Sequence, residues 1–275
     1  MPELPEVETI RRELDAAIVG RRITAVTIVD AKLILGKGAQ AFGAALRGAR
    51  VADTDRRGKL LILATDRGTL VLHLMMTGRI SLRHSPAVRP HTRLVLEFDQ
   101  GPSLHFVDTR RFGRAWMTDQ AGLAALTRRM GPEPLDSAFT AARLAAGLRG
   151  RAVAIKPALL DQRAVAGVGN IYADEALWLA RIHPATPAGS LGRHKVEALA
   201  RAIVTVLRDG VAHGGTSFRT YENSRGEQGA HQRWLKVFRR TGEPCFRCGR
   251  PIERTIVGQR STHSCPRCQR VYVRP

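Results

Sequence analysis

The stretch from residue 245 to residue 268 begins with Cys245-Phe246-Arg247-Cys248 and ends with Cys265-Pro266-Arg267-Cys268. Each Cys-x-x-Cys pair suits one knuckle of a tetrahedral zinc site, and two pairs supply four thiolates. Four protein ligands leave no open position for a water molecule, so we expect one structural Zn²⁺ ion. The segment is too short to bury a core of its own, and the metal therefore holds it folded.

Basic side chains lie at and between these cysteines. They are Arg247, Arg250, Arg254, Arg260 and Arg267. One interpretation is a zinc ribbon that only caps the fold. The charge favours the other interpretation, a zinc-finger β-hairpin that contacts DNA.

The whole chain is strongly basic. Its 275 residues include 44 Lys and Arg against 24 Asp and Glu, a net charge of +20, and 38 of the 44 are Arg. Half of the excess lies in residues 201–275, which hold 15 basic and 5 acidic side chains. Such a field favours a polyanion, and nucleic acid is the leading candidate partner, with a merely soluble basic enzyme as the alternative. Aromatic residues number only 14, which indicates duplex DNA held by its phosphates, because single-strand binders stack bases on aromatic platforms.

Length and composition set further bounds. A chain of 275 residues predicts two or three domains. No apolar run is long enough to span a bilayer, so we expect no membrane partner. The acidic start, Met1-Pro2-Glu3, lacks the features of a signal peptide, and we expect a cytoplasmic protein. In a reducing compartment, four cysteines favour metal binding over disulfides.

The pattern of apolar residues changes twice along the chain. Residues 6–18 are spaced as in an amphipathic helix. Short β-like stretches follow at 23–30, 59–65, 69–76, 92–99 and 103–107. They predict a β-sandwich or flattened barrel with one helix at its front. After a linker at 131–134, the Ala-rich sequence predicts helices at 137–148, 155–164, 170–181 and 190–212, and then a mobile loop at 217–235. The fold class is therefore α+β, with several domains.

Chemistry is suggested at the amino terminus. Removal of Met1, which is normal before proline, leaves Pro2 with a free secondary amine. This amine can attack the C1′ atom of a sugar and form an iminium. Glu3 and Glu6 lie beside it, and proton transfer at a sugar needs such groups. The alternative is a plain helix start with acids in its first turn.

Eight short motifs, in order, resemble those of the formamidopyrimidine-DNA glycosylases (Fpg), base-excision repair enzymes of bacteria. They are Met1-Pro2-Glu3-Leu4-Pro5-Glu6-Val7-Glu8-Thr9, Arg56-Arg57-Gly58-Lys59, His73-Leu74-Met75-Met76-Thr77-Gly78, Asp108-Thr109-Arg110-Arg111-Phe112-Gly113, Gly131-Pro132-Glu133-Pro134-Leu135, Val168-Gly169-Asn170-Ile171-Tyr172-Ala173, Gly214-Gly215-Thr216 and Gly242-Glu243-Pro244-Cys245. The four-cysteine finger completes the series, and the resemblance covers the whole chain.

The resemblance implies three domains. Residues 1–132 would form the catalytic β-sandwich domain with its N-terminal helix. Residues 133–236 would form a helical DNA-binding domain with a helix–two-turn–helix motif and the lesion loop, and residues 237–275 the four-Cys zinc finger. It also implies a bifunctional DNA glycosylase and AP lyase that excises oxidised purines, such as 8-oxoguanine and formamidopyrimidines, by β,δ-elimination. The implied partner is double-stranded DNA with oxidised bases or abasic sites, bound by a monomer in the bacterial cytoplasm and at the nucleoid.

The resemblance also implies roles for catalytic residues. Pro2 would be the nucleophile, and Glu3 would protonate the sugar ring or relay protons there. Lys59 would assist proton transfer and contact phosphate, and without the resemblance it would be taken for a solvated surface lysine. Arg260 in the finger would clamp phosphates beside the lesion. Glu6 would lie near the damaged nucleoside.

Met76, Arg110 and Phe112 match the wedge with which the family fills the duplex. An enzyme that acts on a base must extrude it, and apolar and planar side chains can fill the hole while Arg110 bonds to the orphaned base. The alternative for Met76 and Phe112 is core packing. For Met76 the alternation of residues 70–76 supports it, because Leu70, Leu72 and Leu74 would share its face.

Three further residues are implied to contact DNA. His91 is similar to a DNA-contacting histidine of the family, although Arg93 stands where the family often has a second histidine. Lys156 lies near the helix–two-turn–helix motif and is a candidate phosphate contact. Asn170 matches the asparagine that holds a phosphate, and it could also be a helix N-cap.

Two rival functions remain. An endonuclease VIII-like glycosylase would use the same nucleophile on oxidised pyrimidines, but such enzymes usually begin Pro-Glu-Gly-Pro-Glu, whereas this chain has Pro2-Glu3-Leu4-Pro5-Glu6. A non-catalytic zinc-ribbon DNA-binding protein would need no free amine at Pro2.

Overall fold

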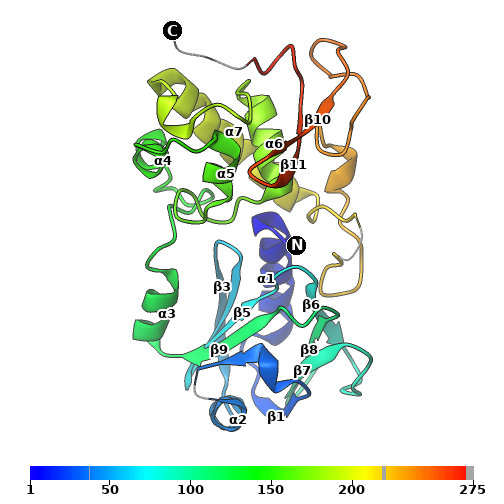
Figure 1. The fold of residues 1–275 in the computed structure, drawn as a ribbon. Coiled ribbons are helices and arrows are strands. Elements are labelled where there is room, and N and C mark those ends of the chain that lie inside the picture. The colour runs from blue at the N-terminus through cyan, green and yellow to red at the C-terminus, as the bar shows by residue number, and fades with distance from the viewer. Residues whose placement is uncertain (37, 219–220, 271–275) are drawn as a thin grey trace. The chain divides into compact units, whose positions relative to one another are not determined.

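The structure is a computed structural model that describes residues 1–36, 38–218 and 221–270 (Figure 1). Its contacts divide the chain into two compact units. The first consists of residues 1–128 and 213–232, and the second of residues 129–212 and 233–275. The second unit thus contains the helices of residues 129–212 and the finger, whereas residues 213–232 belong to the N-terminal unit. The division into three domains stays a prediction.

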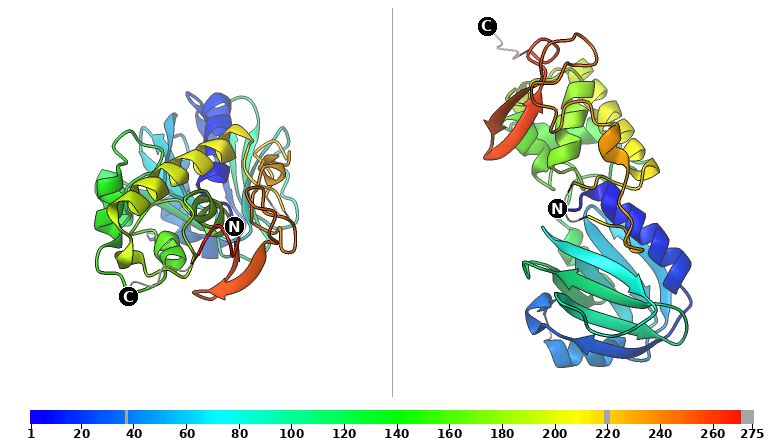
Figure 2. Two further views of the ribbon diagram at one scale, coloured as in Figure 1. Left: turned by 90° about the horizontal axis from the view of Figure 1, so that it is seen from above. Right: turned by 90° about the vertical axis from the view of Figure 1, so that its right-hand side faces the viewer.

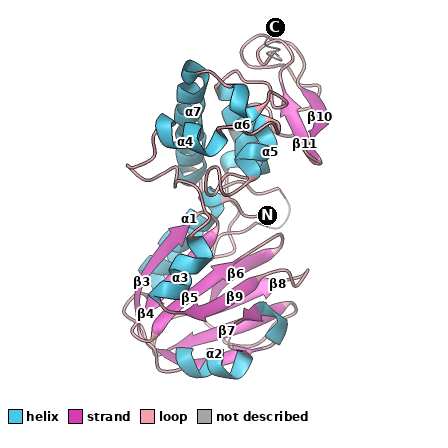
Figure 3. Cartoon of the chain, turned by 60° about the vertical axis from the view of Figure 1, so that its left-hand side comes forward, coloured by secondary structure: helices cyan, strands magenta, loops and turns pink. Residues whose placement is uncertain are grey.

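Two β-sheets make up most of the first unit (Figure 3). One has the strand order β1-β7-β8-β6, formed by Ile23–Ile28, Thr92–Phe98, Ser103–Asp108 and Gly78–Arg83. The other has the order β2-β9-β5-β4-β3, formed by Ile34–Leu35, Arg114–Thr118, Gly68–His73, Leu60–Thr65 and Val51–Arg57. Leucines and other apolar residues of both sheets and of the first helix form one buried cluster. The predicted β-sandwich with an N-terminal helix is confirmed.

Helix α1 (Leu4–Ile18) forms because its sequence combines a good start with an apolar stripe. Glu3 is the N-cap, Pro5 lies in the first turn, and the carboxylate of Glu6 accepts a hydrogen bond from the Glu3 N–H at 2.8 Å. The stripe is fully buried in the core and consists of Leu4, Val7, Ile10, Leu14 and Ile18. Two short helices, α2 (Ala39–Leu46) and α3 (Gln120–Thr127), complete the regular structure of this unit, together with the 3-10 turn η1 (Ala31–Leu33). The 3-10 turn η3 (His231–Arg233) spans the boundary in the chain between the two units.

The second unit is helical and carries one hairpin (Figure 2). Its helices are α4 (Ala141–Leu148), α5 (Ile155–Leu160), α6 (Asn170–Leu179) and α7 (Arg193–Ala212), with the 3-10 turn η2 (Ala188–Ser190). The hairpin pairs β10 (Glu253–Val257) with β11 (Arg260–Ser264), and β11 lies against α6. The predicted helical region and zinc-finger hairpin are confirmed.

The structure departs from the sequence-based elements at their ends, and it contains elements that were not predicted, namely α2, α3, β2, β3, β6 and β9. The strand predicted at 69–76 ends at His73, because the chain turns there and Met75 takes a positive φ of 52°. Strand β3 was missed because Val51–Arg57 is largely polar. Residues 217–235, predicted as a loop, contain only the turn η3 within their described part, and residues 219–220 lie outside it.

Candidate active site and zinc centre

The two carboxylates at the amino terminus are buried, each about 2% exposed. Glu6 divides its two oxygens between two backbone donors. Oε2 accepts from the Glu3 N–H and Oε1 from the Thr216 N–H, each at 2.8 Å. The neighbouring Gly215 has a φ of +82°, and a Cβ atom there would lie 2.9 Å from the Glu6 side chain. Glycine therefore lets residues 214–216 close over this carboxylate.

Lys59 is buried and acts electrostatically on the same amino terminus as Glu3 and Glu6. It is 6% exposed, in the turn between β3 and β4, so the alternative of a solvated surface lysine is wrong. Burial lowers the pKa of the Met1 amino group below its usual value. The carboxylates of Glu3 and Glu6 oppose that shift, while Lys59 adds to it. The amino terminus, two carboxylates and one ammonium group thus act on one another electrostatically.

Pro2, the predicted nucleophile, is buried directly behind Met1, which is 47% exposed. With Met1 in place, the Pro2 nitrogen is an amide and has no lone pair to donate. Only cleavage of the accessible Met1 residue converts it into an amine.

The three predicted wedge residues lie in two loops that Asp108 ties together. Met76 lies in the β5–β6 turn, and Arg110 and Phe112 lie in the β8–β9 loop. The Asp108 carboxylate accepts from the Thr77 hydroxyl at 2.5 Å, from the Arg110 N–H at 3.2 Å and from the Gly113 N–H at 2.7 Å.

The side chains at these loops are exposed to different degrees. Phe112 is 40% exposed, and the guanidinium of Arg110 lies 4.7 Å from the centre of its ring. Core packing is therefore the wrong interpretation for Phe112. Met76 is half-buried and lies beyond the end of β5, so the strand alternation that argued for core packing does not reach it.

His91 is exposed and has a positive φ of 68°. Its carbonyl accepts from the Asp108 N–H at 2.9 Å, and the Arg93 Nε donates to the Asp108 carbonyl at 2.8 Å. Backbone and side chain of one residue, Asp108, therefore connect the His91 loop with the two wedge loops.

Lys156 lies in a different setting from the one the sequence suggested. Its side chain is 0% exposed, and Nζ lies 2.7 Å from an equally buried Asp174 carboxylate oxygen. The ammonium also donates to the Ser261 carbonyl at 2.8 Å and to the Thr262 hydroxyl at 2.9 Å. The other Asp174 oxygen accepts from the His263 N–H at 2.9 Å. This network joins α5 and α6 to β11.

Asn170 is the first residue of α6 and not its N-cap, which is Gly169. The N-cap alternative is therefore wrong. The Asn170 amide donates to the same Ser261 carbonyl at 3.2 Å, and its Oδ1 is buried with no hydrogen-bond partner among the described residues. Arg260 begins β11 directly before Ser261 and is exposed. The structure thus brings Asn170, Lys156 and the strand of Arg260 together.

Asp174 and Glu175 were not among the predicted site residues, although two consecutive acids inside an apolar helix are a signal that could have identified them. Glu175 accepts three backbone N–H groups, those of Lys236, Val237 and Phe238, at 2.8–2.9 Å. Burial raises the pKa of this carboxyl, and the three hydrogen bonds oppose the rise. Glu175 thereby attaches the start of the finger segment to α6.

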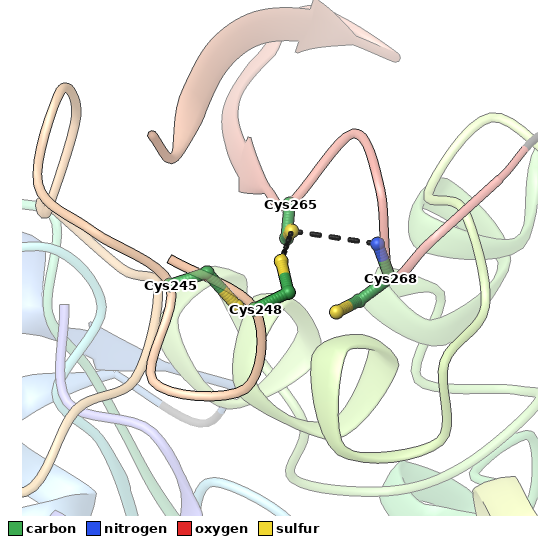
Figure 4. Close-up of side chains that lie close together, drawn as sticks. All are labelled: Cys245, Cys248, Cys265 and Cys268. Carbon is green, nitrogen blue, oxygen red and sulfur yellow. Dashed lines mark hydrogen bonds between the residues drawn. The ribbon is translucent and has the colours of Figure 1, made fainter. Parts of the chain in front are cut away.

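Figure 4 shows the four cysteine side chains gathered from two loops. Their Sγ atoms all lie within 4.8 Å of one another, and those of Cys248 and Cys265 are 3.4 Å apart, too far for a disulfide. A tetrahedral Zn²⁺ with bonds of about 2.3 Å needs sulfurs roughly 3.8 Å apart, so the set fits the ion. Burial opposes ionisation of Cys245, but the N–H groups of Arg247 and of the Trp178 indole outweigh it and lower its pKa to about 6.

Models of known protein families match three successive segments that together cover most of the chain. Residues 1–115 match the formamidopyrimidine-DNA glycosylase N-terminal domain, residues 130–222 the H2TH domain of the same enzymes, and residues 242–271 the zinc finger found in FPG and IleRS. Within the described part of the chain, no helix is both long and apolar enough to cross a membrane.

Relatives and solved structures cover nearly all of the chain. The formamidopyrimidine-DNA glycosylase of Herpetosiphon aurantiacus is 47% identical over 273 residues, which are 98% of this chain and all of that protein. The enzyme of the same name from Moorella thermoacetica is 49% identical over 258 residues, 92% of this chain and 94% of that protein. A Lactococcus lactis FPG mutant in complex with Fapy-dG-containing DNA has a TM-score of 0.90 at 39% identity, covering 98% of this chain and 100% of that one. From the two sheets with their N-terminal helix to the four-cysteine finger, the chain belongs to the formamidopyrimidine-DNA glycosylase family.

Proposed function

We propose that this chain is a bifunctional DNA glycosylase and AP lyase that excises oxidised purines from duplex DNA, with Pro2 as its nucleophile. The observation that carries the proposal is the buried group of charges at the amino terminus, where Glu3, Glu6 and Lys59 act on the amino group of Met1, the residue directly before the buried Pro2. Burial lowers the pKa of this Met1 amine. Once Met1 is removed, we expect the same surroundings to favour the unprotonated form of the Pro2 amine, and only that form attacks carbon.

In the proposed reaction, the Pro2 nitrogen forms a bond to the sugar C1′ atom as the bond from C1′ to the base breaks. The departing base carries the electron pair of that bond and takes up a proton. Glu3 passes protons to and from the sugar oxygen, and the Lys59 ammonium stabilises negative charge on the nearby phosphate. The C1′–O4′ bond of the adduct then breaks, O4′ takes up a proton from Glu3, and the nitrogen lone pair forms the iminium. The iminium acidifies the C2′ proton, whose loss expels the 3′ phosphate, and loss of the C4′ proton then expels the 5′ phosphate and completes the cut.

Binding of the duplex rests on residues with different tasks. Arg260, His91 and Asn170 would hold phosphates. Lys156 would act from its buried position by fixing the Ser261 backbone between Arg260 and Thr262.

The wedge would work at the base pair itself. Phe112 and Met76 would fill the space of the extruded base, and Arg110 would bond to the base left behind. Glu6 would lie near the damaged nucleoside.

One structural Zn²⁺ ion, held by the four cysteine thiolates, would keep the hairpin of Arg260 folded. We also propose that the protein acts as a monomer in the bacterial cytoplasm and associates with the nucleoid when it binds DNA.

Borohydride trapping tests the reaction. Reduction during turnover should freeze a covalent adduct between the Pro2 nitrogen and duplex DNA that contains 8-oxoguanine. An intact enzyme that gives no adduct with this DNA or with abasic DNA would refute the lyase and favour a non-catalytic DNA-binding protein.

The same experiment on oxidised pyrimidines tests the second candidate. Wild-type Lactococcus lactis FPG has been solved with DNA that contains an oxidised pyrimidine, at 38% identity and a TM-score of 0.89 to this chain. An adduct with oxidised pyrimidines alone would assign the endonuclease VIII-like activity in place of the purine activity.

A further inference from the structure

Helix α1 holds the loop of residues 214–230 with two carboxylates, those of Glu6 and Glu13. Glu6 and Glu13 are seven residues apart, which places them two turns from each other, on one face of the helix and about 10 Å apart along its axis. Glu6 Oε1 accepts from the Thr216 N–H. Glu13 Oε2 accepts from both the N–H and the hydroxyl of Ser224, each at 2.7 Å. The two acids thus attach the loop near its beginning and in its second half.

Ser224 is a buried residue of this loop. It is 0% exposed, although it is polar, and its carbonyl accepts from the Leu82 N–H in β6 at 2.7 Å. All three of its polar groups are therefore paired, two of them with Glu13. If the carboxylate were removed, two buried donors would lose their partner, which is costlier than losing an exposed hydrogen bond.

The part of the loop around Ser224 holds its own shape. The Asn223 side chain accepts from the N–H groups of Arg225 and Glu227 at 3.0 and 2.9 Å, and Glu222 pairs with Arg79 at 2.8 Å. A displacement of Ser224 should therefore move residues 222–227 together.

A shift of residues 222–227 would also displace the residues of the loop that contact Glu6. Ser217 donates to the Tyr221 carbonyl at 2.8 Å, and the Tyr221 hydroxyl donates to the Gly214 carbonyl at 3.2 Å. Gly214 and Ser217 flank the Gly215 and Thr216 pair that closes over Glu6. The described part of residues 214–230 contains no helix or strand. These side-chain bonds therefore share the fixing of its path with a few backbone bonds, such as the one that the His231 N–H donates to the Gly215 carbonyl at 3.1 Å.

We propose that Glu13 is a positioning residue that sets this loop for removal of the base and is not needed for cleavage at an abasic site. The proposal rests on the proposed function. A base joined to a C1′ atom within reach of Pro2 lies next to Glu6 and the loop segment that covers it. An abasic sugar presents the same C1′ atom and the same phosphates, with nothing on the side of the loop.

The test compares two activities of one protein. Single-turnover rates are measured on duplex DNA with 8-oxoguanine and on the same duplex with an abasic site. Glu13→Ala should slow excision of 8-oxoguanine by about tenfold or more and change abasic-site cleavage less than about twofold. Ser224→Ala, which keeps the N–H bond to Glu13, should lower excision by a smaller factor.

Asp15→Ala is the matched control. Asp15 lies two residues further along α1, and its carboxylate accepts from the Thr54 hydroxyl in β3 at 2.9 Å, away from the loop. This variant should leave the ratio of the two rates unchanged. If Glu13→Ala does not fold, as judged by its melting temperature, Ser224→Ala carries the same comparison.

Two results would overturn the proposal: equal loss of both activities, or no change in the ratio in either variant. Failure of the proposed function would look different, because the unmodified protein would then neither cleave abasic DNA nor form a trapped adduct with it.

Discussion

The Lys156 ammonium lies 2.7 Å from the Asp174 carboxylate, and neither side chain is exposed to solvent. Since Lys156 also donates to the backbone of Ser261 and Asn170 donates to the same carbonyl, this pair fixes where Arg260 begins its strand. The surface that we propose to bind phosphate is thereby positioned by a buried ion pair.

Removal of the negative charge from this pair should be strongly destabilising. Asp174→Asn keeps an acceptor for the His263 N–H but removes the negative charge that balances the buried ammonium, so we expect a loss of about 3–5 kcal/mol in the free energy of unfolding. Urea denaturation measures it. The double variant Lys156→Met, Asp174→Asn should lose less than the sum of the single variants, and additive losses would contradict a direct coupling.

A free secondary amine at residue 2 should be required for strand cleavage at the normal rate. A form that retains Met1 has an amide nitrogen there, and Pro2→Gly removes the secondary amine, so both should cut 8-oxoguanine DNA slower by on the order of 100-fold or more. Binding should survive, since the proposed phosphate contacts of His91, Asn170 and Arg260 lie elsewhere in the chain. Mass spectrometry of the intact amino terminus identifies the form, and gel assays give cleavage and binding. Cleavage at the normal rate by either form would exclude Pro2 as the nucleophile.

Phe112 should matter for extrusion of the base and little for the fold. Because the ring is 40% exposed, Phe112→Ala should change the free energy of unfolding by less than about 0.5 kcal/mol while slowing excision roughly tenfold. Fluorescence of a base analogue at the lesion would report extrusion. Val19→Ala removes an equally exposed apolar side chain (39%) at the far end of α1 and should leave excision unchanged. A large loss of stability in Phe112→Ala would show instead that the ring is a packing residue.

His73 should make the first unit sensitive to acid. Burial, helped by the charge of Lys59, lowers the pKa of this imidazole from 6.5 to about 4, and its Nδ1 accepts from the Met75 N–H at 2.9 Å. The folded protein therefore favours the neutral form of the His73 imidazole. Its stabilising contribution is complete above pH 6.5 and is lost as the pH falls towards 4, by roughly 3 kcal/mol at most.

The variant His73→Asn offers an acceptor at a similar place and does not titrate in this range. Thermal unfolding should therefore show a shallower loss of stability between pH 6.5 and 4 for His73→Asn than for the unmodified chain. Parallel curves would mean that His73 protonates as easily in the folded protein as in the unfolded one.

Local patterns in the sequence predicted a large part of the fold. The apolar stripe of α1, the cysteine spacing of the finger and the short apolar runs of β4, β5, β7 and β8 depend on neighbours in the chain and can be read there. Strand β3 escaped because its polar residues carry no such period, and the end of β5 was placed three residues late because periodicity does not reveal where a turn begins.

The residues of the candidate site also fall into those that the sequence identifies and those that only the structure identifies. The sequence by itself determined the four zinc ligands, the nucleophile candidate and the acids beside it, because these groups lie a few residues apart and their chemistry depends on residue type. Only the tertiary structure decided that Lys156 is buried against Asp174, that Lys59 is buried beside the terminal amine, and that Glu13 holds Ser224. Glu13 and Ser224 are 211 positions apart, and burial and hydrogen bonding between such distant residues arise only when packing brings their elements together.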